Sequence, residues 1–264
     1  MVLSIYQVDA FTDKPFNGNP AGVCVLLEQA SDEWMQNVAS EMNLSETAFL
    51  IKQDIGYNLR WFTPTIEVDL CGHATLASAH ILWEQNYLPE NEEAIFYTKS
   101  GLLTAKKTAN GGIELNFPIE PDSETICPNG LLESLGVQAR YIGKNRFDYI
   151  VEVSSEEEVR NLKPDFNGLN KIPCRGVIVT SISASQEYDF VSRFFCPGVG
   201  VNEDPVTGSA HCCLAPYWKN RLNKNHFIAS QVSERGGILT VRLEDQRVYI
   251  GGQAVTVLKA ELFC

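Results

Sequence analysis

The sequence has none of the segments that would carry it into or through a membrane. No apolar run in its 264 residues approaches the roughly 18 to 20 residues that span a bilayer. The N-terminal stretch Met1–Asp9 lacks both the basic region and the long apolar region of a secretory signal peptide. We therefore expect a soluble, cytoplasmic protein.

Positive charge is also scarce. The chain has 21 Lys and Arg residues against 33 Asp and Glu residues, which gives a formal net charge of −12. No segment clusters Lys and Arg densely enough to follow a phosphate backbone, so we expect neither nucleic acid nor an anionic membrane as a partner. A small anionic substrate is compatible with this charge, because one local positive site can outweigh the surrounding negative field.

Signatures of common cofactors and metals are missing. There is no GxGxxG, Walker A or GxSxG motif, and the four histidines form no HExxH pair. The eight cysteines include no C-x-x-C pair, and two of them are adjacent, which suits neither a disulfide framework nor a zinc knuckle. We expect reduced thiols and a protein without metal or cofactor. The cysteines are Cys24, Cys71, Cys127, Cys174, Cys196, Cys212, Cys213 and Cys264.

What the sequence does contain is one internal repeat. Gly72 opens a segment of small residues, and Gly208 opens a similar one 136 positions later. Several matches in the same order and at a nearly constant offset indicate duplication rather than a chance likeness between two β-α-β stretches. The other matching pairs are Arg60–Pro64 with Arg193–Pro197, Gly101–Lys106 with Gly237–Arg242, and Ala48–Ile51 with Val177–Thr180, the last at an offset of 129.

The repeat predicts two α+β lobes, 1–120 and 121–264, with the last strand able to pair with the first lobe. The join falls near the turn-rich stretch Pro118–Pro128. The segment Gly72–Trp83 is apolar nearly all round, which is typical of a buried helix, so each lobe is expected to wrap a mostly antiparallel sheet or barrel around one central helix. Further expected elements are strands at 21–27, 47–52 and 57–63, a helix capped by Ser31, and hairpin turns at 110–112 and 244–246.

The glycines that open the two central helices mark the first candidate site. A helix start exposes unpaired amides and a partial positive charge, which suits a carboxylate, and glycine lets a ligand approach the backbone closely. Two such starts, Gly72–His73 and Gly208–Ser209, would face the cleft that duplicated lobes form between them. The alternative is that both glycines merely make tight turns into packed helices, and the sequence alone favours neither interpretation.

Glu46 is the candidate acid/base. It follows a predicted helix and directly precedes an apolar strand, so its carboxylate is expected at a sheet edge, partly desolvated and suited to moving protons. A solvated loop glutamate is the alternative. Asp204 can cap or turn into the second helix. His73 can donate to a nearby carbonyl at the first helix start, and His80 is expected to pack in the core.

Six stretches of the sequence together carry a family likeness. They are Val8–Thr12, Phe16–Val23, Asn43–Phe49, Arg60–Pro64, Asp69–Thr75 and Glu203–His211. With them the sequence resembles the phenazine-biosynthesis PhzF-like family, which shares the diaminopimelate-epimerase fold. The resemblance implies two pseudo-symmetric domains with the active site between them, a homodimer and no cofactor.

The resemblance also implies roles for particular residues. The glutamate of the Ser-Glu-Thr-Ala-Phe motif, Glu46, is the implied acid/base, and His73 and Asp204 are implied to support the substrate and proton transfer. The remaining implied site residues bind a small anionic carboxylate substrate, and no metal is implied. They are Gly72, Ala74, Thr207, Gly208 and Ser209.

The epimerase branch of this fold needs two thiols, one at each helix start. Here Cys71 occupies the first position and the repeat places Thr207 at the second, so stereoinversion by two thiols is disfavoured. A single carboxylate suits isomerisation, in which a proton moves between carbons of a small carboxylic or amino acid. Two alternatives stay open: a racemase, epimerase or dehydratase that uses Cys71 with Glu46 or Asp204, and a non-enzymatic protein that acts through partner proteins.

Overall fold

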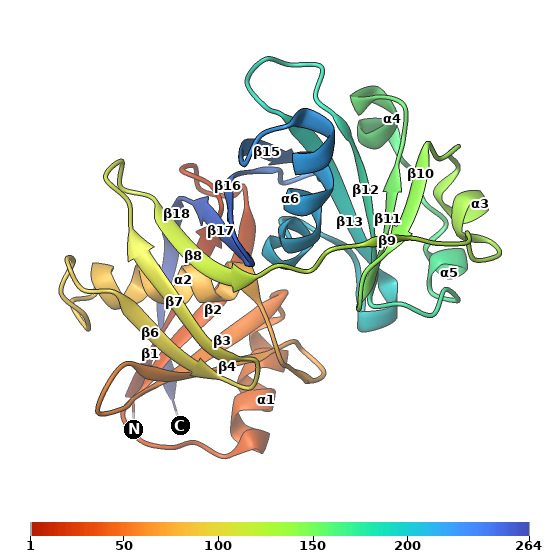
Figure 1. Cartoon of the computed structure of the whole chain (residues 1–264). Coiled ribbons are helices and arrows are strands. Elements are labelled where there is room, and N and C mark those ends of the chain that lie inside the picture. Colours follow the sequence, from red (N-terminus) through yellow and green to blue (C-terminus); the bar gives the residue numbers. More distant parts are fainter. Residues whose placement is uncertain (1, 264) are drawn as a thin grey trace. The chain divides into compact units, whose positions relative to one another are not determined.

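The computed structural model describes residues 2–263 and divides the chain into two compact units (Figure 1). Unit 1 consists of the residues up to Phe117 and those from Ile250 onward, and unit 2 is Pro118–Tyr249. The sequence-based division assigns 121–264 to the second lobe and allows the last strand to pair with the first; in the structure the residues from Ile250 onward pack in unit 1. The physical reason is the last strand, β18 (Ala254–Phe263), which pairs antiparallel with β1 (Val2–Ala10) along its length.

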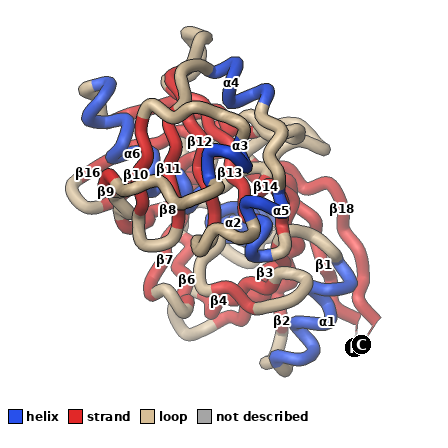
Figure 2. Tube along the Cα trace, turned by 90° about the vertical axis from the view of Figure 1, so that its right-hand side faces the viewer, coloured by secondary structure: helices blue, strands red, loops and turns tan. Residues whose placement is uncertain are grey.

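Strands outnumber helices in each unit, as the red segments of Figure 2 show. The elements of unit 1 besides β1 and β18 are β2 (Asn19–Leu26), α1 (Asp32–Met42), β3 (Glu46–Lys52), β4 (Tyr57–Phe62), β5 (Glu67–Val68), α2 (Gly72–Glu84), β6 (Ala94–Thr98), β7 (Gly101–Lys107) and β8 (Ile113–Pro118). Those of unit 2 are β9 (Ser123–Glu124), α3 (Leu131–Leu135), β10 (Tyr141–Lys144), β11 (Asp148–Glu152), α4 (Glu156–Asn161), α5 (Phe166–Leu169), β12 (Gly176–Ile182), β13 (Phe190–Cys196), the 3₁₀ turn η1 (Pro197–Val199), β14 (Val201–Asp204), α6 (Gly208–Leu222), β15 (His226–Gln231) and β16 (Gly237–Glu244). Strand β17 (Arg247–Gly252) crosses the boundary between the units.

The two units have the same strand topology. In unit 1, β1 and β2 are antiparallel, β2 and β3 parallel, and β4 pairs antiparallel with β3 and β5 and parallel with β6. In unit 2, β10 and β11 are antiparallel, β11 and β12 parallel, and β13 pairs antiparallel with β12 and β14 and parallel with β15. The internal repeat and the fold class predicted from the sequence are therefore confirmed.

One part of the predicted repeat is shifted by a residue. Phe49 pairs with Arg60, and Val179 pairs with Arg193, so Phe49 corresponds to Val179 at an offset of 130. The sequence-based offset of 129 is wrong there, because the stretches compared are almost uniformly apolar and carry no alternation that fixes the register. The offset of 136 between the two central helices is confirmed, since both begin at the matched glycines, Gly72 and Gly208.

The central helix of unit 1, α2, is buried on almost every side and packs against β1, β2, β3 and β18. Its counterpart α6 is buried over most of its length. The expectation that His80 packs in the core is wrong, because its side chain is 19% exposed. Nε2 of His80 lies 3.0 Å from Oγ1 of Thr256 on β18 and 3.3 Å from Oε1 of Glu84, so the ring belongs to a polar cluster at the edge of the helix.

The local signals at helix and turn positions are confirmed. Oγ of Ser31 accepts a hydrogen bond from the backbone N–H of Trp34 at 3.2 Å and caps α1. The two predicted hairpins turn between β7 and β8 and between β16 and β17. None of the helices in residues 2–263 has the length and apolar character needed to cross a membrane. The seven cysteines within the described range are free thiols, and Cys264 lies outside it.

Candidate active site

A cluster of four polar side chains surrounds the start of helix α2. His73, the second residue of this helix, is 3% exposed, and its ring touches a different partner at each nitrogen. Nδ1 lies 3.0 Å from Nδ2 of Asn19 and 3.5 Å from Sγ of Cys71. Nε2 lies 3.1 Å from Oε2 of Glu46. Three elements, β2, β3 and α2, therefore bring these side chains together.

Local backbone structure places Glu46 at this point. Helix α1 ends at Asn43, whose left-handed backbone turns the chain, and Glu46 then begins β3 opposite Ala21 of β2. The Glu46 side chain is 19% exposed, so one edge of the carboxylate reaches the surface. Its Oε2 is buried and makes no hydrogen bond of acceptable geometry with any described residue, although Nε2 of His73 is within reach. A carboxylate in this state has an oxygen ready to take a proton.

The electrostatics of the cluster couple three ionisable groups. Burial raises the pKa of Cys71 to about 11, and the charge of Glu46 acts in the same direction, so the thiol is protonated at neutral pH. Burial lowers the pKa of His73, but negative charge on Cys71 and Glu46 more than offsets this and holds the pKa above its ordinary value. Because Cys71 is protonated at neutral pH, Glu46 is the counter-charge that acts on the ring under those conditions.

The same cluster has the spacing of a metal site. One donor atom from each of Glu46, Cys71 and His73 lies within 4.8 Å of the others. A carboxylate, a thiolate and an imidazole are ligands that Zn²⁺ accepts. The sequence-based expectation of a metal-free protein therefore stays a prediction.

The starts of α2 and α6 differ from those of three other helices. Ser31, Ser155 and Asp165 cap α1, α4 and α5 with their side chains. The residues at the corresponding positions of α2 and α6, Cys71 and Thr207, place no side-chain oxygen on the helix amides, and only the weakly accepting sulfur of Cys71 faces the Ala74 amide. An uncapped helix start keeps its partial positive charge and its amides available to an anion.

In unit 2 the hydroxyl that could cap α6 is engaged elsewhere. Oγ1 of Thr207 donates to Oδ2 of Asp204 at 2.5 Å and accepts from Nε2 of Gln231 at 3.1 Å. Oε1 of Gln231 accepts from the backbone N–H of Thr207 at 2.8 Å, and Gln231 is fully buried. Asp204 and Gln231 thus hold Thr207 in a fixed orientation in front of Gly208 and Ser209.

The structure places the predicted site residues in two groups. Glu46, Gly72, His73 and Ala74 gather at the start of α2 in unit 1, where the Ala74 amide faces the sulfur of Cys71. The other group comprises Asp204, Thr207, Gly208 and Ser209 at the start of α6 in unit 2. Sequence reasoning missed two residues, Asn19 and Gln231. Asn19 belongs to one of the family-like stretches, and that was the only sequence signal for it.

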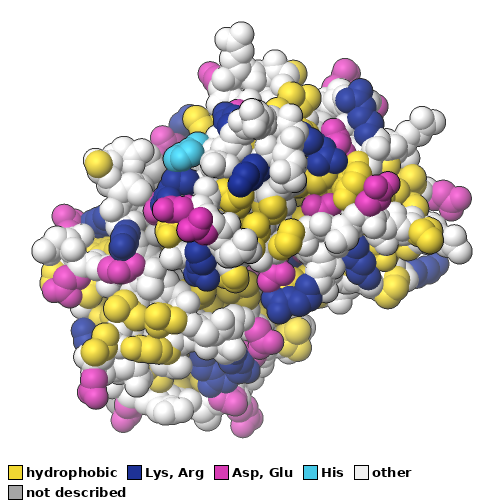
Figure 3. Space-filling model, viewed as in Figure 1, with side chains coloured by type: hydrophobic (Ala, Val, Ile, Leu, Met, Phe, Trp, Pro, Cys, Tyr) yellow, Lys and Arg dark blue, Asp and Glu magenta, His cyan; other side chains and the backbone are white. Residues whose placement is uncertain are grey.

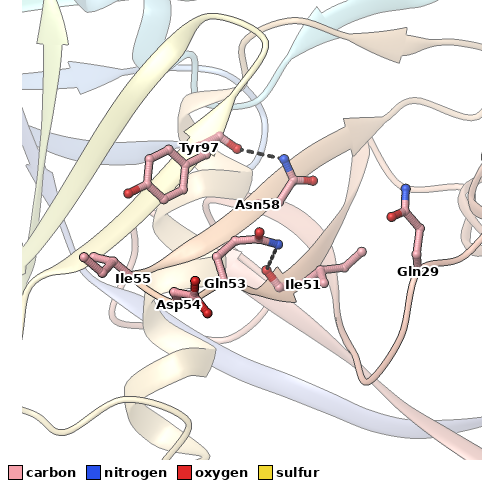
Figure 4. Close-up of a pocket in the computed structure, with 7 residues that line it drawn as sticks. All are labelled: Gln29, Ile51, Gln53, Asp54, Ile55, Asn58 and Tyr97. Atoms are coloured by element: carbon pink, nitrogen blue, oxygen red, sulfur yellow. Dashed lines mark hydrogen bonds between the residues drawn. The ribbon is translucent and has the colours of Figure 1, made fainter.

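An open hollow of unit 1 lies elsewhere. It has a volume of about 600 Å³ and is lined by residues beyond the far end of β3 and from β4 and β6 (Figure 4). Glu46 begins β3, whereas Gln53 and Asp54 of the hollow follow its last residue, so the two sites are separated by the length of a seven-residue strand. In the hollow the amides of Gln53 and Asn58 bond to backbone carbonyls of Ile51 and Tyr97. It brings no acid/base pair together.

Over the face in Figure 3, basic and acidic side chains are interspersed with apolar ones.

Two copies of one mixed-sheet topology, each around a buried helix with an uncapped start, define the class of diaminopimelate-epimerase-like folds. A family model described as phenazine biosynthesis-like protein matches residues 8–260. The chain belongs to this phenazine biosynthesis-like family.

Individual related proteins agree with this assignment. An "Uncharacterized isomerase" from Halalkalibacterium halodurans is 60% identical, with 99% of each chain covered, and the human "Phenazine biosynthesis-like domain-containing protein" is 39% identical over 99% of each chain. A crystal structure of a PhzF family protein from Enterococcus faecalis is 42% identical, with a TM-score of 0.94 and full coverage of both chains. A hydroxyproline epimerase from Agrobacterium vitis, 11% identical with a TM-score of 0.67, shares the fold alone. The family supports an activity of the isomerase or epimerase type.

Proposed function

We propose that the protein is a cofactor-independent isomerase that moves a proton between carbons of a small carboxylic or amino acid, with Glu46 as the acid/base. The observation that carries the proposal is the state of Glu46. The Glu46 side chain is 19% exposed, and its Oε2 lies 3.1 Å from Nε2 of the buried His73. An acid/base needs a carboxylate that reaches the surface at one edge and a neighbour that can share its proton at the other.

The reaction can be written with one carboxylate. Glu46 removes a proton from the carbon next to the substrate carboxylate, so that a C–H bond breaks and negative charge spreads over the carboxylate and an adjacent double bond. The same group then returns the proton to the far carbon of that double bond on the same face. One C–H bond is lost and one is formed, and the double bond moves by one position.

Negative charge that develops on the substrate carboxylate needs stabilisation. We assign this role in unit 1 to the amides at the uncapped start of α2, Gly72–His73; the start of α6 in unit 2, Gly208–Ser209, has equivalent amides. The attraction between the partial positive charge of a helix start and a ligand strengthens as the ligand becomes more negative, which favours the transition state over the ground state. In this proposal Asp204 contributes by drawing the Thr207 hydroxyl away from the α6 amides, to which it would otherwise bond.

Thiol chemistry at Cys71 is the weaker candidate. The pKa of Cys71 is raised to about 11, chiefly by burial, so almost no thiolate is present at neutral pH. The residue that corresponds to it in unit 2 is Thr207. A two-thiol epimerase needs both sulfurs, and this chain offers one.

The test is substrate-dependent deuterium uptake from D₂O, followed by proton NMR in buffer containing a chelator. A panel of small acids that includes cyclohex-2-ene-1-carboxylate, whose double bond can shift to the ring position next to the carboxylate, is screened first for thermal stabilisation and then for exchange. Glu46→Gln is expected to lower exchange at least about 100-fold, the usual contribution of a general acid/base, while circular dichroism shows an intact fold. Glu41→Gln, on the exposed face of α1, is the matched control and should retain activity. Exchange at an undiminished rate in Glu46→Gln would contradict the assignment.

A further inference from the structure

Strand β18 has one paired edge and one open edge. Within residues 2–263 its register is with β1 alone, and in Figure 2 it lies at the right-hand side of the picture, beside β1. None of its ten residues is buried, and its exposed apolar side chains include Leu258 at 44% and Phe263 at 83%. The backbone N–H and C=O groups along such an edge form a template for another strand.

The charged residues of this strand are one lysine and one glutamate, two positions apart. Lys259 and Glu261 are both exposed, lie on the same face of β18 and form no ion pair with any residue in 2–263. The Lys259 ammonium lies 5.3 Å from the centre of the Tyr6 ring. Charges on an edge strand usually repel an incoming strand. Charges of opposite sign on one face instead favour a second copy, provided that the register places unlike charges opposite each other.

Strand geometry limits the registers in which two copies of β18 can pair. The backbone groups of alternate residues point to opposite edges of a strand, and β1 occupies one of these edges. Two copies related by a twofold axis must therefore match residues of the same parity, so the axis passes through a residue. A bulge interrupts the ladder with β1, since Gln7 pairs with Leu258 and Val8 with Thr256. Regular pairing is thus confined to Leu258–Phe263.

Charge selects one of the remaining registers. An axis through Lys259 or Glu261 places like charges directly opposite each other, and an axis through a flanking apolar residue leaves both charges without a charged partner. An axis through Ala260 places Lys259 opposite Glu261 of the second copy, and symmetry supplies the reverse pair. The same register places Leu258 opposite Leu262 on the other face of the strand, with the small side chain of Ala260 at the axis.

We propose that β18 is an interaction surface for a second copy of this chain, and that the two strands pair antiparallel about Ala260 in one continuous sheet. Backbone hydrogen bonds hold the two strands together, and the two ion pairs between Lys259 and Glu261 fix the register. The paired stretch is short, so we expect concentration-dependent association rather than an obligate dimer. The proposal is independent of the acid/base role assigned to Glu46.

The experiment is sedimentation velocity at low salt over a range of about 1 to 200 µM protein, in which the wild type should change from monomer to dimer. Lys259→Glu and Glu261→Lys each place like charges opposite each other, and each should raise the dissociation constant at least about tenfold. Lys163→Glu makes the same change of charge at an exposed position of unit 2 and should associate as the wild type does. Circular dichroism checks that each variant is folded.

The decisive measurement mixes the two single variants. In a mixed dimer one pair is the native Lys259–Glu261 pair and the other is the same pair reversed, so both are attractive. The equimolar mixture should therefore associate within about threefold of the wild type, although neither variant does so alone. The double variant Lys259→Glu/Glu261→Lys should recover in the same way.

Four outcomes would overturn the proposal. A wild type that stays monomeric over the whole concentration range has no such surface. A dimer that neither single substitution weakens uses another surface. Weakened association in both single variants without recovery in their mixture contradicts the register about Ala260. Open-ended oligomers in place of a closed dimer contradict the twofold axis.

Discussion

The buried histidine of unit 2 should make this unit lose stability in mild acid. Burial lowers the pKa of His211 to about 4, against 6.5 for an unperturbed histidine, while its bond to the Thr207 carbonyl acts in the opposite direction. The ring is fully buried and stacks on Phe190 at a centroid distance of 6.0 Å, so the folded state cannot solvate an imidazolium. The unfolded chain can solvate the imidazolium, and it therefore binds the proton at higher pH than the folded chain does.

The size of the effect follows from proton linkage. Because the folded pKa lies below the unfolded pKa, the stability that a neutral His211 provides is complete above about pH 6.5 and is lost between about pH 6.5 and pH 4. A shift from 6.5 to about 4 corresponds to a total of about 3 kcal/mol, and about 2 kcal/mol of this is lost between pH 7 and pH 5.

The assay is urea unfolding at pH 7 and pH 5, followed by circular dichroism, for the wild type and for His211→Gln. Glutamine does not titrate, so the wild type should lose about 2 kcal/mol more than the variant between these pH values. His226→Gln, at an exposed position of β15, is the matched control for the loss of an imidazole. Equal losses in the wild type and His211→Gln would refute the claim that His211 is held neutral by burial.

Two further predictions concern the thiol and the repeated ion pair. Cys71→Ser should retain most of the exchange activity. In the wild type, Cys71 should resist alkylation by iodoacetamide at pH 7.5, because this residue is 5% exposed and burial raises the pKa of its thiol to about 11. A loss of exchange activity in Cys71→Ser as large as that in Glu46→Gln would restore a thiol mechanism. Arg193→Gln should lower the free energy of unfolding in urea by about 3 kcal/mol. Arg193 pairs with Glu203 through two hydrogen bonds of 2.7 Å, and its guanidinium also donates to three backbone carbonyls around the end of α4. The equivalent Arg60→Gln should cost less, about 1 kcal/mol, because Lys99 continues to pair with the Glu67 carboxylate; equal costs would contradict this reasoning.

The fold was predictable to the extent that local signals determine it. The apolar run after Gly72, the Ser31 cap and the turn residues each act over a few positions, and together they predict a duplicated α+β chain. The register between the repeats could not be predicted in the stretch Ala48–Ile51, where consecutive apolar residues give no alternation. The sequence predicts that the last strand can pair with the first lobe, but the register of β18 against β1 joins the two ends of the chain and has no local sequence signal.

The candidate site was predictable only in part. Glu46 and His73 stand at a strand start and a helix start, and such positions have a recognisable sequence context. That the two touch follows from parallel pairing of β2 and β3 and from the packing of α2 on both. Asn19 and Gln231 act across 54 and 24 residues respectively. Nothing in their immediate surroundings distinguishes a buried amide that orients a neighbour from an ordinary polar residue at a strand end.

The proposed acid/base, Glu46, has no counterpart at the equivalent position of unit 2. The corrected register matches Glu46 with Gly176, since these residues begin equivalent strands and pair with Ala21 and Asp148 respectively. A Cβ on Gly176 would lie 2.3 Å from Cζ of Phe194, whose ring fills the space that a side chain at this position would need. A carboxylate cannot be placed there without moving a buried aromatic ring, and such a change costs roughly 1 to 3 kcal/mol or more. The packing of unit 2 thus leaves no room for a carboxylate at the position equivalent to Glu46, which agrees with the proposal that a single group removes and returns the proton.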